Sequence, residues 1–284
     1  MSLLTTTGAV GGLLPEEWGP LLVEPVTAAS LALNPAVSTL VETQNVSFHV
    51  PVVNTDAASS WVAEGAEIAP SDPSISELTI VPRKAAGLVI ISSELANDSS
   101  PAAAEVVGGS LARSLARTID TAFFGALAAP APSGLGALTN ASLNRVIAGV
   151  TPSNLDAFAQ AISLVEVDGA EITAFCANPA DALTVQTIKT GTGFSAPLLG
   201  TDAANGTARQ ILGVPLLVSA KIPQGVVWGV AAPRNFTVLR TDVTVTTDGS
   251  VFFTSDRIAV RATMRIGFGF PTPMAVAKIA LAAS

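Results

Sequence analysis

The sequence predicts an α+β fold in which long strands, one long helix and a smaller α/β unit are joined by extended segments. Three observations indicate this class. Apolar and polar residues alternate near both ends of the chain, an apolar row at four-residue spacing lies in its first half, and helical and strand patterns alternate over residues 153–233. The 284 residues suffice for one large domain or two modest ones with a sizeable core.

The composition indicates that partner subunits cover much of the surface. Hydrophobic residues make up 49% of the chain and charged residues 13%, against about 25% charged in ordinary soluble proteins. A membrane could also cover such a surface, but no stretch approaches the ~20 apolar residues of a spanning helix, so we expect no membrane partner. The N-terminus has no cationic residue before its apolar stretch, so it does not resemble a secretory signal, and we expect an intracellular product.

Residues 1–45 are expected to form an extended arm. Four widely spaced prolines interrupt them, and their apolar residues follow neither the helical nor the strand period. We expect the apolar side chains of the arm to dock on the same or a neighbouring subunit: Leu13, Leu14, Trp18, Leu21, Leu22 and Val23.

Residues 46–92 are expected to form a long β-hairpin. Val46, Phe48, Val50 and Val52 alternate with other residues, and Pro51 marks an edge strand. A second strand pattern spans residues 76–93. The connection between the two is far longer than an ordinary hairpin turn, and it carries Trp61 beside Glu64 and Glu67. We therefore expect it to project and to end on a partner.

A long helix is predicted from Ser100, as N-cap, and Pro101, at the first helical position. Its apolar row advances by about 40° at each four-residue step, too far around the axis for one partner to cover; the row is Val107, Leu111, Leu115, Ile119 and Phe123. Arg113, Arg117 and Asp120 are assigned to another face, where Arg117 and Asp120 are spaced to pair weakly.

Residues 130–152, rich in Pro, Gly and Ala, are expected to be a loop region that precedes a compact α/β unit. In this unit Ser153 is predicted to cap a helix, Asp168-Gly169 to turn the chain into a strand at 170–177, and Asn178-Pro179 to begin a second helix. Two strands are expected at 212–219 and 225–231.

The chain from residue 235 onward is expected to form strands, the last of them a long alternation from Arg257 to Phe268. Arg257, Arg261 and Arg265 share one face of that strand. Such a row favours pairing with carboxylates of neighbouring strands or subunits, and contact with DNA phosphates is the alternative.

No catalytic residue, cofactor site or metal site is predicted. His49, the one histidine, lies in an edge strand, where a solvated or satisfied polar position is the preferred interpretation, so imidazole-based catalysis is excluded. Cys176 is interpreted as a small buried hydrophobe. The acidic pairs in loops are read as solvated charge, and the glycine-rich segments lack the strand-to-helix junction of a phosphate site. A net charge of −8 argues against a module that grips polyanions.

The order of these elements resembles the major capsid protein of tailed bacteriophages, the Hong Kong 97 fold. The resemblance covers nearly the whole chain and rests on diffuse signals in a consistent order. It lies in the arm and in five segments: SSWVAEGAEIAPSDPSISELTIVPRKAAGLVIISSEL, AAAEVVGGSLARSLARTIDTAFF, ANPADALTVQTIKT, ILGVPLLVSAKIPQGVVWGVAAP and DRIAVRATMRIGFGFPTPMAVAKI.

The resemblance implies an N-terminal arm (1–45), an extended loop (46–92) over the adjacent subunit, a peripheral domain with a spine helix (93–150 and 234–284) and an axial domain (151–233). It implies pentamers and hexamers of one icosahedral virion shell, assembled in the bacterial cytoplasm around double-stranded DNA that is enclosed without sequence-specific binding. Separate portal and decoration proteins are further candidate partners. Because the chain begins almost at the arm, scaffolding is expected to be either a separate protein or dispensable. Subunit-interface residues are assigned as Trp18, Trp61, Glu64, Glu67, Arg83, Lys84, Arg113 and Arg117.

The prototype of that fold links its subunits by Lys-Asn isopeptide bonds. The loop tip around Glu64 to Pro73 has no lysine here, and Lys84 is displaced along the returning strand, so we expect no covalent links. Two alternatives stay open: an encapsulin-like nanocompartment, disfavoured because the chain start lacks a helical cargo-docking segment, and a soluble α/β enzyme with a metal or carboxylate site.

Overall fold

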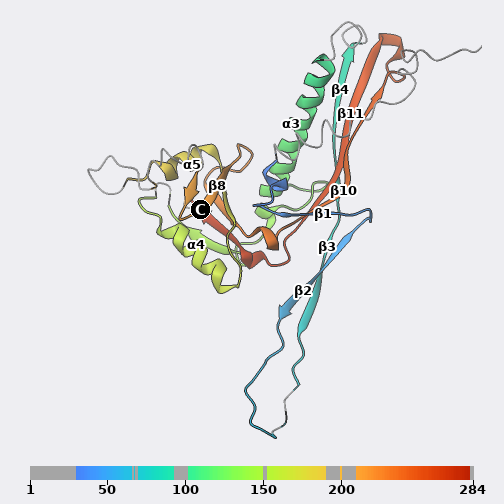
Figure 1. Cartoon of the computed structure of the whole chain (residues 1–284). Coiled ribbons are helices and arrows are strands. Elements are labelled where there is room, and N and C mark those ends of the chain that lie inside the picture. The colour runs from blue at the N-terminus through green and yellow to red at the C-terminus, as the bar shows by residue number, and fades with distance from the viewer. Residues whose placement is uncertain are drawn as a thin grey trace, which may run out of the picture.

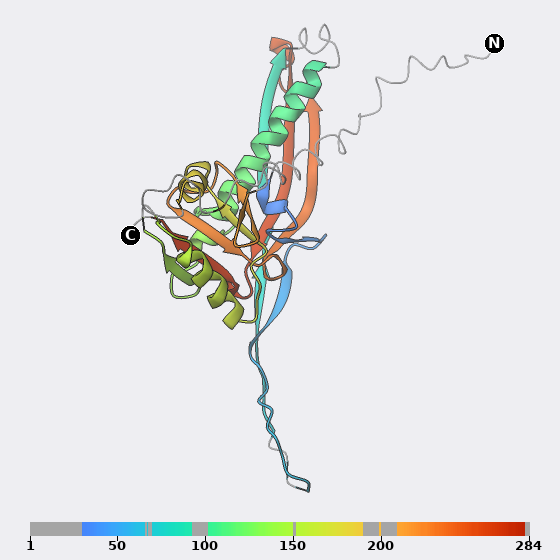
Figure 2. The same cartoon turned by 60° about the vertical axis from the view of Figure 1, so that its left-hand side comes forward.

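The computed structural model of the chain describes residues 30–65, 67, 70–92, 102–149, 152–189, 199 and 209–281. They form three parts: a four-stranded sheet beside one long helix, a six-stranded sheet with two shorter helices, and a two-stranded hairpin that projects away from both (Figure 1, Figure 2). The predicted α+β class is confirmed.

The four-stranded sheet has the order β1-β10-β11-β4. Its strands are β1 (Thr39–Glu42), β4 (Arg83–Ser92), β10 (Phe236–Asp248) and β11 (Arg257–Gly269). The alternation predicted for β11 is confirmed, because Ala262, Met264 and Ile266 are buried while all three arginines of the row are exposed. The strand patterns at 235–242 and 243–249 form the single strand β10, whose register against β11 shifts between Leu239 and Thr244.

Helix α3 (Ala102–Phe124) covers one face of this sheet (Figure 1). Its predicted apolar row is confirmed at four positions, since Leu111, Leu115, Ile119 and Phe123 are buried. The fifth, Val107, is half-buried. The ring of Phe123 meets those of Phe124 and Phe268 edge-on, with centroids 5.0 Å apart in each pair, a favourable aromatic geometry. The predicted cap at Ser100 and Pro101 lies outside the described residues.

The six-stranded sheet has the order β5-β12-β9-β6-β8-β7. Its strands are β5 (Asn144–Ile147), β6 (Ala174–Ala177), β7 (Gln210–Ile211), β8 (Val214–Val218), β9 (Val226–Val230) and β12 (Val276–Ala280). The expectation of a loop over residues 130–152 is wrong at β5, whose four residues are too few to give a period but pair in parallel with β12. Strands β5 and β12 therefore extend this sheet beyond residues 153–233.

Helices α4 (Asp156–Val167) and α5 (Pro179–Gln186) flank this sheet. The prediction of Ser153 as a cap is wrong: α4 begins after Leu155 without a side-chain cap. The cap at Asn178 is confirmed, since its side chain accepts a hydrogen bond from the N–H of Ala180 at 3.1 Å. The turn at Asp168-Gly169 is also confirmed, with Gly169 at φ 69°, where a side chain would be strained.

Part of the expected arm belongs to the body of the molecule. Residues Leu31–Leu33 form the short helix η1, and β1 pairs in parallel with β10. Ala32 and Val37 are fully buried in the core beneath α3. The remainder of the expected arm, residues 1–29 with Trp18, lies outside the described residues.

The remaining short 3₁₀ helices are η2 (Leu135–Ala137), η3 (Ala232–Arg234), η4 (Phe253–Ser255) and η5 (Pro273–Ala275). Two apolar cores result: one joins α3 to the four-stranded sheet and to one face of the other sheet, and one joins α4 and α5 to the opposite face. In the part of the chain that the structure describes, no helix is long and apolar enough to cross a bilayer.

Candidate functional site

The hairpin consists of β2 (Phe48–Thr55) and β3 (Ser74–Ile80), which pair only with each other. The predicted run at 76–93 divides at Pro82, so that β3 belongs to the hairpin and β4 to the four-stranded sheet. Both figures show the hairpin extending away from the rest of the molecule (Figure 1, Figure 2). An isolated two-stranded ribbon is marginally stable in water, so this hairpin is suited to lie against another surface.

The base of the hairpin is anchored to the body. Ile80 is 3% exposed and lies against Gly267 and Gly269 of β11. A Cβ atom on Gly269 would collide with the Ile80 side chain, and one on Gly267 would make a tight contact with it at 3.0 Å. The position of the hairpin base on the sheet therefore depends on two residues without side chains.

The tip of the hairpin is bare. Trp61 has a relative exposure of 105%, and Glu64 and Glu67 beside it are also exposed. Neither glutamate forms an ion pair with another described residue. A fully exposed tryptophan flanked by two unpaired carboxylates is the composition of a contact surface.

His49 forms a hydrogen-bonded chain across the hairpin. Its Nδ1 contacts the Glu77 carboxylate and its Nε2 lies 3.0 Å from the Ser47 hydroxyl. This order of serine, imidazole and carboxylate is that of a hydrolase triad, but the side chains of His49 and Glu77 are 53% and 57% exposed on a bare ribbon. Water solvates these groups, so they do not form a catalytic site. The hydrogen bonds tie the two strands together instead, and the interpretation of His49 as a satisfied polar position is confirmed.

The face of the four-stranded sheet away from α3 is cationic. Register places Lys84 of β4 directly opposite Arg265, with Arg261 and Arg257 further along the same face. Like charges directly opposite each other are unfavourable in an antiparallel pair. Among the described residues none of these four cations forms an ion pair with a carboxylate. The expected pairing with carboxylates of neighbouring strands is limited to a weak attraction between Arg261 and Asp248 of β10. Hydrogen bonds from Ser250, followed by this attraction, lower the pKa of Asp248.

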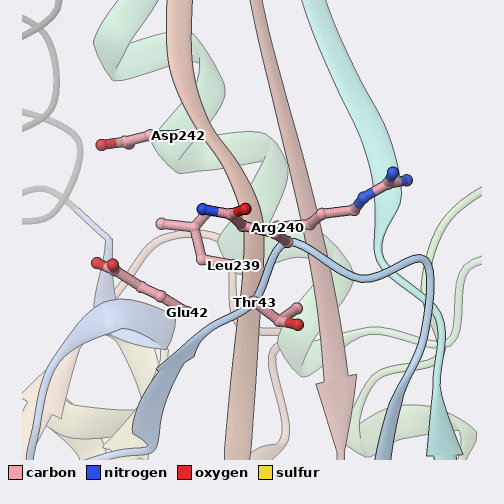
Figure 3. A pocket seen from close by; sticks show the side chains of 6 residues that line it. Glu42, Thr43, Leu239, Arg240 and Asp242 are labelled. Carbon is pink, nitrogen blue, oxygen red and sulfur yellow. The ribbon is translucent and has the colours of Figure 1, made fainter.

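A polar hollow of about 400 Å³ lies where β1 meets β10. Figure 3 shows the carboxylates of Glu42 and Asp242 extending to one side of β10, whereas the Arg240 side chain extends to the other. The guanidinium therefore does not neutralise the two carboxylates, and this edge of the sheet stays acidic.

Asp120 is a buried polar centre that the sequence analysis assigned wrongly. It is 3% exposed and does not pair with Arg117. Its Oδ1 accepts hydrogen bonds from the Ser30 hydroxyl at 2.8 Å and the Ala32 N–H at 3.2 Å, and its Oδ2 accepts one from the Ser219 hydroxyl at 3.1 Å. Burial raises the pKa of Asp120 above its ordinary value, although these bonds act in the opposite direction.

The described residues contain no group of three or more His, Cys, Asp or Glu side chains that could hold a metal ion. Cys176 is buried, as predicted. Burial, followed by the nearby charge of Asp120, raises the pKa of its thiol far above the ordinary value, and such a thiol is inert as a nucleophile.

The residues assigned to subunit interfaces form separate groups. Trp61, Glu64 and Glu67 lie at the hairpin tip, Arg83 and Lys84 lie at the start of β4, and Arg113 and Arg117 are exposed along α3. One chain does not bring these groups together, and Trp18 lies outside the described residues. The sequence analysis did not predict that Asp120 is buried. A signal for it existed: Ala112, Ala116 and Asp120 form a second row at four-residue spacing along the helix.

Comparison with known proteins completes this description. A family model described as "Phage capsid family" matches residues 10–281. No curated protein matches the chain by sequence.

Three solved structures share the fold. The capsid of a native GTA particle, computed with C5 symmetry, has 22% identity and a TM-score of 0.70, covering 99% of this chain and 100% of that one. A structure from Microbacterium phage Oxtober96 has 20% identity and a TM-score of 0.74, and the match covers 98% of this chain and 96% of that one. A structure from Mycobacterium phage Adephagia has 16% identity and a TM-score of 0.74, and the match covers 99% of this chain and 96% of that one.

Proposed function

The chain belongs to the phage capsid family, and we propose that many copies of it form the pentamers and hexamers of a closed icosahedral shell around double-stranded DNA. Membership of this family makes the protein a structural component of the virion capsid and not an enzyme. The capsid of the similar GTA particle was computed with fivefold symmetry, which supports a shell built from copies of one chain.

The hairpin is the observation that carries the proposal. Its base is fixed by Ile80 against β11, whereas its tip bears an exposed tryptophan and two unpaired carboxylates. A subunit that had to be stable alone would gain nothing from such a projection. A subunit in a shell gains a contact that reaches over its neighbour.

We further propose the division of the chain into an arm (1–45), an extended loop (46–92), a peripheral domain (93–150 and 234–284) and an axial domain (151–233). In this division η1 and β1 are the part of the arm that packs on the body, and β4 is the part of the loop that joins the four-stranded sheet. The two apolar cores support two main bodies. Strands β5 and β12 join the six-stranded sheet from the peripheral ranges, and one of the two cores contains residues of both sheets, so the two bodies pack directly against each other.

Arg113 and Arg117 are proposed interface residues on the outer side of α3, where both are exposed and unpaired among the described residues. The arginine row of β11 is proposed to meet carboxylates of a neighbouring subunit. Its exposed charges, which form no ion pair among the described residues, and the opposed Lys84 and Arg265 support this, because acidic side chains from outside the chain would relieve the like-charge contact. Scaffolding, portal and decoration proteins are proposed further partners of the shell.

Shortening the hairpin tests the proposal. Replacing residues 56–73 by Asn-Gly would join β2 to β3 through a tight turn and remove only residues that are exposed where the structure describes them. We expect the shortened chain to fold with an unchanged melting temperature but to sediment as unassembled subunits, while the wild-type chain sediments as large particles. Large particles of normal yield from the shortened chain would contradict the proposed role of the hairpin.

A further inference from the structure

The start of β4, the end of α3 and the loop that follows α3 enclose a pocket of about 310 Å³. Ile119, Ala122 and Ile266 line it and are buried, and Leu127, at 44% exposure, also lines it. Arg83 and Lys84, at the start of the edge strand β4, complete the lining. Arg83 shares its face of β4 with Ala85, whereas Lys84 lies at the same edge on the face of Arg265. The pocket is thus apolar inside and cationic at one side, and neither cation is neutralised by a described carboxylate.

The hairpin tip has the complementary composition. Trp61 is the one large aromatic side chain that is fully exposed in the described chain. Glu64 and Glu67 follow it closely in the same loop. Tryptophan is the residue type most characteristic of interface anchors that fill apolar pockets. Opposite charges beside the anchor would fix its orientation and exclude wrong partners.

The tip cannot fill the pocket of its own chain. The pocket is lined by the start of β4, which follows the hairpin base along the chain, while Trp61 lies in the connection between β2 and β3. Figure 1 shows the hairpin extending away from the body. The 7 residues of β3 alone span about 23 Å. The complementary groups therefore meet only between two copies.

We propose that Trp61 of one subunit inserts into this pocket of a neighbouring subunit, with Glu64 and Glu67 facing Arg83 and Lys84. The inference rests on the proposed shell, and it names the contact that the hairpin makes there. It also accounts for the cationic start of β4, since two carboxylates from the neighbour would offset the charges that the chain itself leaves unpaired.

Tryptophan fluorescence tests the contact directly. The chain has three tryptophans, and Trp228 is buried at 2% exposure, so the variant Trp18→Phe leaves Trp61 as the accessible fluorophore. In particles purified from expressing cells we expect a blue-shifted Trp61 emission and a several-fold lower acrylamide quenching than in subunits dissociated from them. Unchanged quenching in intact particles would overturn the inference and leave the shell standing. Absence of particles would overturn the proposed function and this contact with it.

A matched pair of variants locates the contact. Leu127→Glu places a carboxylate in the pocket wall, where it repels Glu64 and Glu67, whereas Val251→Glu makes the same kind of change at a site that is 69% exposed and outside the pocket. We expect Leu127→Glu to lower the particle yield or restore Trp61 quenching, and Val251→Glu to behave as the wild type. Equal behaviour of the two variants would contradict the proposal.

Charge reversal separates a direct contact from a folding effect. We expect Lys84→Glu to reduce particle yield several-fold, and the combination of Lys84→Glu with Glu64→Lys and Glu67→Lys to restore most of it. A combined variant that assembles no better than Lys84→Glu alone would show that these charges do not meet.

Discussion

Asp120 lies on the buried side of α3, where its carboxylate accepts hydrogen bonds from Ser30 and Ala32 near the start of the described chain and from Ser219 near the six-stranded sheet. One side chain thus ties two separate segments to the long helix. A buried carboxylate is expensive unless such donors satisfy it. The sequence analysis placed Asp120 on another face than the apolar row, although Ala112 and Ala116 precede it at four-residue spacing on the buried side.

The substitution Asp120→Asn tests this arrangement through pH. The pKa of Asp120 is raised in the folded state from the ordinary 3.8, so the folded state holds this proton more tightly than the unfolded state. Its favourable contribution is therefore fully present below 3.8 and is lost as the pH rises through the folded value. We expect the unfolding free energy of the wild type, minus that of Asp120→Asn, to increase as the pH falls from 7 toward 4.

Chemical denaturation of unassembled subunits at several pH values measures this difference. Asp72→Asn, at an exposed site on the hairpin loop, serves as the control and should show a smaller change with pH. A difference that is flat, or that decreases as the pH falls, would contradict the burial of Asp120 as an ionisable group.

At the scale of elements, the sequence predicted those whose pattern is long. The long alternation of β11 from Arg257 to Phe268 and the apolar row of α3 were both predicted because each pattern repeats several times. Short elements were not predicted. Strand β5 has four residues and is defined by its parallel pairing with β12, which is far away in the sequence. The division of one predicted run at Pro82 could not be seen either, since β3 and β4 differ in pairing partner and not in local pattern.

The end of α3 depends on close packing with the loop that follows it. A Cβ atom on Gly134 would collide with the carbonyl oxygens of Ala122 and Phe123 and would lie 2.7 Å from that of Gly125. We expect Gly134→Ala to lower the unfolding free energy by about 1–3 kcal/mol. Gly249→Ala, at a site where the added Cβ meets nothing within 4 Å, should be close to neutral. Thermal unfolding of both variants measures the contrast, and equal melting temperatures would contradict the packing at Gly134.

At the scale of the whole molecule, the interface residues predicted from sequence stay predictions, because one chain holds Trp61 and Lys84 far apart. What the sequence could supply was chemistry: an exposed aromatic residue with carboxylates, and cations at the start of a strand. What it could not supply was the pocket, which needs β4, α3 and the following loop to be placed in space.

Subunits of the shell are expected to be held together without covalent bonds. The hairpin tip contains no lysine, and Lys84 lies at the start of β4, so an isopeptide bond formed from the tip has no amine donor. Particles boiled in SDS should therefore run as a single band near 28.6 kDa. A ladder of higher bands that survives boiling would show that the subunits are cross-linked.

The central claim is that neighbouring copies complete this chain by covering its hairpin and its cationic sheet face. Electron microscopy of the purified, expressed protein tests it most directly. We expect closed shells in which the subunits cluster around fivefold and sixfold positions, with each hairpin lying over an adjacent subunit. A population of monomers at every concentration, with the hairpin folded back onto its own body, would contradict the account.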